Sequence, residues 1–64
     1  MKTTYINKEE LYDRFDKVAS PIGTIFHIVA VHEFSDFDII DVEDANGNRY
    51  NIRGDVFNSI FEEV

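Results

Sequence analysis

Two short turns impose the strongest constraint on how this chain can fold. Ser35-Asp36 and Ala45-Asn46-Gly47 interrupt a stretch rich in β-branched and aromatic residues. They divide it into three predicted antiparallel strands, at 24–34, 37–44 and 48–53. A slip of one residue in strand pairing would move every side chain of a strand to the opposite face. The turns therefore also predict which residues face the core.

The second turn predicts the register of its hairpin. A two-residue loop, Asn46-Gly47, would place Val42 opposite Asn51 and would leave apolar residues without apolar partners. A three-residue loop with Gly47 in the left-handed conformation avoids this loss, so we prefer it. Its predicted pairs are Val42 with Tyr50, Ile40 with Ile52, and Glu43 with Arg49.

The first turn predicts a register that agrees with the second on one apolar face of the sheet. It pairs Phe34 with Phe37, Val31 with Ile40 and Val29 with Val42. The predicted apolar face consists of Ile25, Val29, Val31, Ile40, Val42, Tyr50 and Ile52. The reverse face has an apolar end, made of Phe26, Ile28, Ala30, Phe34, Phe37 and Ile39, and a polar end, made of Asp41, Glu43, Arg49 and Arg53.

Helical patterns flank the predicted strands. Asn7 is a good N-cap, and residues 8–19 place apolar side chains at helical spacing. Asp55 can cap a second helix that continues to Val64. The predicted fold is therefore a single α+β domain of residues 1–64, a three-stranded antiparallel sheet between an N-terminal and a C-terminal helix (α-β-β-β-α). A curled SH3-like barrel is the alternative, and Thr3–Ile6 could add an edge strand.

Composition narrows the function to binding without catalysis. The chain has 64 residues, no cysteine and a formal charge of −7, which repels nucleic-acid backbones and anionic membranes. No apolar stretch approaches the roughly 20 residues that cross a bilayer, so we expect a cytoplasmic protein. His27 and His32 lie five residues apart on one predicted strand and should point to opposite faces. We therefore expect no metal site, no cofactor and no enzymatic activity.

A cluster of carboxylates is the strongest functional signal. Six acidic residues lie between positions 33 and 44 with no basic residue among them. Alternating acids on a strand lie about 6.6 Å apart on one face, which is close to the phosphate spacing of nucleic acid. They could instead be solvated turn and edge residues. The predicted partner-binding residues are Glu33, Asp36, Asp38, Asp41, Glu43 and Asp44, with Phe34 and Phe37 as apolar anchors.

In size, charge, lack of cysteine and strand-helix order, the chain resembles small acidic bacteriophage anti-defence proteins, among them anti-CRISPR proteins and DNA mimics. The segment 23–26, which leads to the hairpin of 44–48, is also similar to small SH3-like domains of phage genomes. The resemblance implies an inhibitor that occupies the basic groove of a nucleic-acid-binding host protein, in the host cytoplasm. The alternative is a scaffolding module that forms a homodimer or binds a peptide through Phe26, Ile28, Phe34, Phe37 and Ile39.

Overall fold

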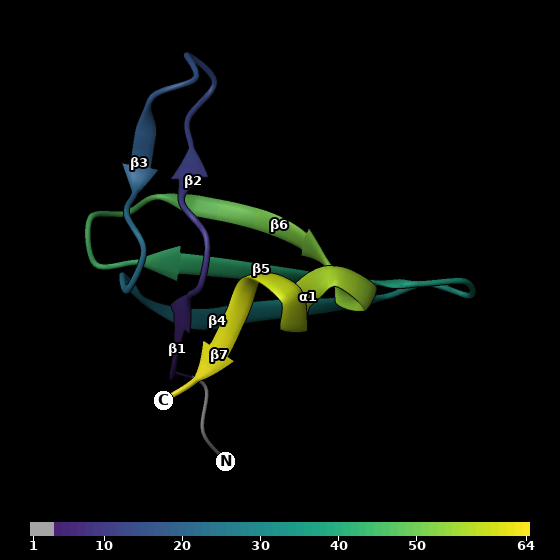
Figure 1. The fold of residues 1–64 in the computed structure, drawn as a ribbon. Helices are drawn as coiled ribbons and strands as arrows, with labels where there is room; N and C mark the ends of the chain where they lie inside the picture. Colours follow the sequence, from purple (N-terminus) through teal and green to yellow (C-terminus); the bar gives the residue numbers. More distant parts are fainter. Residues whose placement is uncertain (1–3) are drawn as a thin grey trace.

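Strands dominate residues 4–64, the part of the chain that the computed structural model describes (Figure 1). A five-stranded antiparallel sheet has the order β6-β5-β4-β1-β7, and β2 and β3 form a separate two-stranded hairpin. The strands are β1 (Thr4–Asn7), β2 (Leu11–Tyr12), β3 (Val18–Ser20), β4 (Ile25–Glu33), β5 (Asp38–Asp44), β6 (Arg49–Arg53) and β7 (Phe61–Glu63). The helix α1 (Gly54–Ile60) joins β6 to β7.

The short helix requires the large sheet to curve. α1 carries the chain from one edge strand, β6, to the other, β7, with seven residues that span about 10 Å. Four strand spacings of a flat sheet would separate these edges by about 19 Å. The sheet must therefore bend back on itself, and in Figure 1 β1 and β7 run across the direction of β4, β5 and β6.

The concave side of this sheet holds the core. Phe26, Val42, Phe57 and Phe61 are buried, and they come from β4, β5, α1 and β7. The ring of Phe61 makes an edge contact with Phe26 at 5.2 Å and stacks on Phe57 at 4.9 Å. Partly buried apolar residues surround them: Tyr5, Leu11, Ile28, Ile40, Tyr50, Ile52 and Ile60.

The predicted register of the β5–β6 hairpin is confirmed. Val42 pairs with Tyr50, Ile40 with Ile52 and Glu43 with Arg49. Gly47 has a φ of 85°, a region that favours glycine, as the three-residue loop requires. The turn residues together with the pairing of apolar residues were sufficient to place this hairpin correctly.

The predicted faces of β4 are wrong for the residues that precede a β-bulge near Val29. The pair Val31–Ile40 forms as predicted, but a register shift between Ile28 and Ala30 makes Ile28, and not Val29, the partner of Val42. An extra residue on one strand exchanges the faces of everything that precedes it. Phe26 is consequently a core residue, whereas Ile25 and Val29 are exposed. Val31 keeps its predicted pairing but is also exposed.

The predicted helix at 8–19 is wrong, because this segment forms the β2–β3 hairpin. The Asp13 carboxylate accepts hydrogen bonds from the backbone N–H of Phe15 and Lys17, which stabilises a turn in competition with a helix. Asp16 has a φ of 61° in that turn. Of the apolar residues at helical spacing, Leu11 packs against the core, whereas Phe15 is 68% exposed and Val18 is 44% exposed.

Asn7 also has a different role from the predicted helix cap. Its buried side chain donates to the carbonyls of Glu9 and Ser20 and accepts from the N–H of Thr24. The amide thereby joins three separate segments of backbone. β1, which Asn7 ends, lies between β4 and β7 and is not an edge strand. Thr3, which the predicted edge strand included, lies outside the described residues.

The predicted C-terminal helix is too long and begins two residues late, because the prediction took Asp55 as the cap. α1 starts at Gly54, and its N-cap residue, Arg53, makes no side-chain capping bond. The chain becomes extended at Phe61 and enters β7. With one short helix and seven strands in residues 4–64, the predicted α-β-β-β-α fold is wrong, and a three-stranded core between two helices does not describe the protein. None of the helices in residues 4–64 has the length and apolar character to cross a membrane.

Candidate functional site

The tip of the β4–β5 hairpin carries an exposed aromatic pair. The backbone N–H of Phe34 donates to the carbonyl of Phe37 at 2.9 Å and closes the Ser35-Asp36 turn. The two rings lie 5.2 Å apart between centroids, at 31° to one another. Phe34 is 55% exposed and Phe37 is 38% exposed. In Figure 1 this hairpin projects beyond the rest of the molecule.

An arginine from the neighbouring strand packs on this pair. The guanidinium carbon of Arg53 lies 4.8 Å from the centre of the Phe37 ring, which is a cation–π distance. Arg53 Nη2 also forms an ion pair with Asp55 Oδ2 at 3.2 Å. Since Arg53 ends β6 and β5 lies between β6 and β4, Phe37 lies between Arg53 and Phe34 across the sheet.

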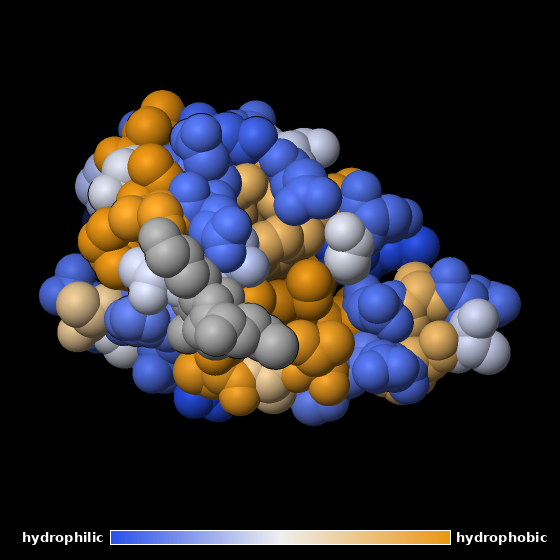
Figure 2. All heavy atoms as spheres, turned by 90° about the horizontal axis from the view of Figure 1, so that it is seen from below, coloured by the Kyte–Doolittle hydropathy of each residue, from blue (hydrophilic) through white to orange (hydrophobic). Residues whose placement is uncertain are grey.

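A hollow of about 510 Å³ opens between the hairpin tip and the start of α1. The backbones come close here because position 54 is glycine, where an added Cβ would lie 3.3 Å from Asp38 Cβ. Figure 2 shows hydrophobic atoms among hydrophilic ones at the narrow end of the molecule, on the right, which is this hairpin. The hollow is lined by Phe34, Ser35, Asp36, Phe37, Asp38, Ile40, Gly54 and Asp55.

Two acids at the tip oppose one another. Glu33 and Asp38 are direct partners in the β4–β5 register, and both are exposed. Like charges directly opposite one another destabilise a strand pair. The salt bridges found among residues 4–64 include none with Glu33, Asp36 or Asp38. We call the group Glu33, Phe34, Asp36, Phe37, Asp38, Arg53 and Asp55 the hairpin site.

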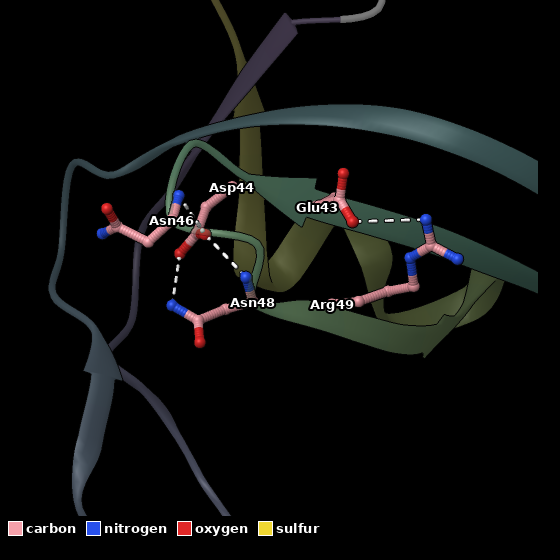
Figure 3. A network of polar contacts seen from close by, with 5 residues as sticks. All are labelled: Glu43, Asp44, Asn46, Asn48 and Arg49. Atoms are coloured by element: carbon pink, nitrogen blue, oxygen red, sulfur yellow. Dashed lines mark hydrogen bonds and ion pairs between the residues drawn. The ribbon is translucent and has the colours of Figure 1, made fainter.

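Asp41, Glu43 and Asp44, the other predicted binding acids, do not extend the hairpin site as a row. Asp41 Oδ2 lies 2.8 Å from His32 Nε2, its side chain is only 16% exposed, and its Oδ1 is buried with no hydrogen-bond partner among residues 4–64. Glu43 pairs with Arg49 at 3.2 Å (Figure 3). Asp41 and Glu43 lie on the face opposite Val42, whereas Asp44 shares the core-facing side.

Asp44 is a structural carboxylate. It is 5% exposed and accepts hydrogen bonds from the Asn48 amide and the backbone N–H of Asn46 and Asn48 (Figure 3). It also accepts a hydrogen bond from the Ser20 hydroxyl. Burial acts to raise its pKa, but these four hydrogen bonds to the charged form outweigh burial and lower the pKa below the ordinary value. Asp44 therefore holds the β5–β6 turn and does not face a partner.

The two histidines lie on the same face of the sheet, contrary to the sequence prediction. His27 pairs with Glu43 and His32 with Ile39, and both partners point away from the core. The bulge near Val29 supplies the extra residue that changes the parity between them. They remain separate, because His27 contacts Thr4 and His32 contacts Asp41. Within residues 4–64, no group of three or more potential ligands could hold a metal ion.

Of the predicted binding residues, the structure places Glu33, Phe34, Asp36, Phe37 and Asp38 together at the hairpin tip. Arg53 and Asp55, which the prediction did not include, lie beside them. The signal for Arg53 was available, since the confirmed β5–β6 register places it opposite Ile39, two residues from Phe37. Asp55 was interpreted as a helix cap and is instead the carboxylate partner of Arg53.

A second hollow, of about 210 Å³, lies between the β2–β3 hairpin and the β5–β6 turn. Tyr12 and Tyr50 contribute aromatic rings to it, and Arg14 and Arg49 contribute cations. The pKa of Tyr12 is raised, first by its hydrogen bond to Glu10 and then by the charge of that carboxylate. Arg14 lies over Phe15, and Arg49 pairs with Glu43, so internal contacts already engage both cations.

Comparisons with protein-family models, with curated proteins and with solved structures each found no match.

Proposed function

We propose that this chain is a small, non-catalytic binding protein that docks its hairpin site on a basic surface of a protein partner. Occupancy of that surface would inhibit a partner that binds nucleic acid, as in the phage anti-defence proteins that the chain resembles. The observation that supports this proposal is the exposed pair Phe34 and Phe37, flanked by carboxylates at the tip of a projecting hairpin.

The charge arrangement favours a cationic partner. Glu33 and Asp38 face one another across the hairpin at a cost of about 0.2–1 kcal/mol, by the usual strength of cross-strand pairs. A lysine or arginine placed between them would remove this repulsion on binding. The formal charge of −7 would also steer a basic protein toward the chain and keep nucleic acid away.

The aromatic pair supplies the apolar part of the proposed interface. Exposed phenylalanines that become buried on binding contribute strongly to protein interfaces, with a polar rim around them. Phe34 and Phe37 have this arrangement, with Asp36 in the connecting turn and Asp38 beside them in the hollow. Asp41, Glu43 and Asp44 are not part of the proposed surface, because internal contacts engage them.

The alternative interface for self-association is less favoured. Of its five residues, Phe26 is fully buried and Ile28 packs against the core. Phe34, Phe37 and Ile39 cannot reproduce the predicted surface without them. Self-association of two copies with a formal charge of −7 would strengthen as ionic strength rises, and binding of a neutral peptide would change little, whereas the proposed interface weakens.

The test compares two neutralised triple variants of equal charge. Glu33→Gln, Asp36→Asn and Asp38→Asn neutralise the hairpin site. Glu9→Gln, Glu62→Gln and Glu63→Gln neutralise exposed acids elsewhere, and each set changes the formal charge from −7 to −4. Wild type and both variants are immobilised, and the basic nucleic-acid-binding proteins retained from a host lysate are identified at low and at physiological salt. Each retained protein is then tested for nucleic-acid binding in the presence of the chain.

We expect wild type and the control variant to retain the same basic protein and to displace nucleic acid from it. We expect the hairpin variant to do neither, and retention to fall as salt rises. Equal losses in both variants would mean that only total charge matters, and this would contradict the proposed site. Retention that does not change with salt would contradict the electrostatic basis of the proposal.

A further inference from the structure

We infer that the hairpin site selects arginine over lysine, so that its partner presents an arginine-bearing segment. This inference rests on the proposed function and specifies the partner chemistry. It follows from the contact that the protein makes with its own Arg53, which packs on one ring of the aromatic pair and pairs with a nearby carboxylate.

Arg53 shows how this surface binds a guanidinium group. The group lies over the Phe37 ring at 4.8 Å and directs Nη2 to the Asp55 carboxylate at 3.2 Å. The planar guanidinium can stack on a ring with its flat face and donate hydrogen bonds from its edge. One ring and one carboxylate therefore bind the two parts of the same side chain.

Phe34 repeats the aromatic half of this arrangement without an internal cation. Across the sheet the order is Arg53, Phe37 and Phe34, so Phe34 is the outer ring of the pair. β1 pairs with β4 only at residues 25–27, and no other described strand lies beside the outer edge of β4 near Phe34. Phe34 is 55% exposed, and the cation–π contacts found among residues 4–64 do not include it.

Carboxylates that would bind the edge of a guanidinium stacked on Phe34 lie beside this residue. Asp36 and Asp38 line the same hollow as Phe34. If an arginine of the partner stacked on Phe34, each ring of the aromatic pair would hold one guanidinium group, with Arg53 on Phe37 and the partner's arginine on Phe34. Its guanidinium edge would be directed to carboxylates that have no ion pair among residues 4–64.

Lysine would satisfy this site less well. Its ammonium group is strongly hydrated and acts as a point charge, whereas the weakly hydrated guanidinium stacks and can bind a carboxylate through two hydrogen bonds. One exposed cation–π contact corresponds to about a twofold to fivefold change in affinity. With the carboxylate contact included, we expect arginine to bind about threefold to tenfold tighter than lysine.

The experiment measures binding of fluorescent hexa-arginine and hexa-lysine peptides, which carry equal formal charge, by fluorescence anisotropy. The protein is wild type, Phe34→Leu, Phe34→Tyr or Phe15→Leu. Phe34→Leu keeps an apolar side chain but removes the ring, and Phe34→Tyr restores a ring. Phe15→Leu is the matched control, because Phe15 is also exposed and also lies beside an arginine, Arg14. The neutralised hairpin triple variant is measured with both peptides.

We expect the threefold to tenfold preference for hexa-arginine in wild type, Phe34→Tyr and Phe15→Leu, and a preference below about twofold in Phe34→Leu. Equal affinities in wild type, or an unchanged preference in Phe34→Leu, would overturn the inference while leaving the proposed function intact. Binding of both peptides that is as strong in the hairpin triple variant as in the control triple variant would instead contradict the proposed function itself.

Discussion

Replacement of Asp44 by asparagine tests whether this acid stabilises the fold. The carboxylate is 5% exposed and accepts four hydrogen bonds, two at Oδ1 from the turn N–H groups and two at Oδ2 from Ser20 Oγ and Asn48 Nδ2. An asparagine oxygen can keep the two turn bonds. Its amino group would then face the Ser20 hydroxyl and the Asn48 amino group (Nδ2), and an amino group that only donates cannot accept this bond.

The expected loss follows from these contacts. A hydrogen bond to a charged group contributes about 1.5–3 kcal/mol, so losing the Asn48 amide bond and rearranging the Ser20 bond should cost about 2 kcal/mol. A chain of this size has a free energy of unfolding of roughly 3–10 kcal/mol. At about 4–8 °C per kcal/mol, the Tm should fall by roughly 8–16 °C.

The pH dependence of stability gives a second, independent test of the role of Asp44. Since the pKa of Asp44 is lower in the folded protein than its ordinary value, the carboxylate contributes its full stabilisation above the unfolded pKa of about 4. This contribution is lost as pH falls through the lowered pKa. The difference in stability between wild type and Asp44→Asn should therefore be largest at neutral pH and should narrow as the pH falls below about 4.

Thermal unfolding followed by circular dichroism between pH 2.5 and pH 7 measures both effects. Asp36→Asn is the matched control, because Asp36 is an exposed turn residue and its neutralisation should change stability by less than about 0.5 kcal/mol. Equal Tm values for Asp44→Asn and Asp36→Asn at pH 7 would refute the structural role of Asp44. A stability difference that grows on acidification would refute the direction of its pKa shift.

Four further substitutions test the fold, each by urea unfolding. Gly47→Ala should cost about 1–2 kcal/mol, because alanine is strained at a φ of 85°, and an unchanged midpoint would contradict the left-handed turn. Phe26→Ala should cost about 3–5 kcal/mol and Phe15→Ala less than about 0.5 kcal/mol, whereas the opposite ranking would support a helix at 8–19. Asn7→Ala should cost about 1–3 kcal/mol, since it removes the buried hydrogen bonds to the Ser20 carbonyl and the Thr24 N–H, of which the N–H keeps the Pro21 carbonyl as an acceptor, and a cost below about 0.5 kcal/mol would refute this role.

Local turn chemistry made the β5–β6 hairpin predictable. Asn46 and Gly47 are compatible with a loop of two or three residues, and the apolar pairing then selects the three-residue loop, whose register is the observed one. The Ser35-Asp36 turn likewise placed Phe34 beside Phe37 at the tip. The position of Phe34 and Phe37 at the hairpin tip was therefore predictable from the sequence.

Features set by tertiary context were not predictable in the same way. No local signal marks the bulge near Val29, yet this one residue decides that Phe26 enters the core and Ile25 does not. The segment 8–19 has helical periodicity, but the Asp13 turn and the buried bridge of Asn7 hold it as a hairpin. The hydrogen bonds that bury Asp44 also come from residues distant in sequence, among them Ser20.

The central claim is that the hairpin site binds a positively charged ligand. The most direct test is a two-dimensional ¹H–¹⁵N NMR titration of the protein with hexa-arginine at low and at physiological salt. The largest shift changes should fall on residues 33–38 and 53–55, and they should weaken with salt. Changes spread evenly over the other exposed acids, such as Glu9, Glu62 and Glu63, or centred on the hollow beside Tyr12, would contradict the claim.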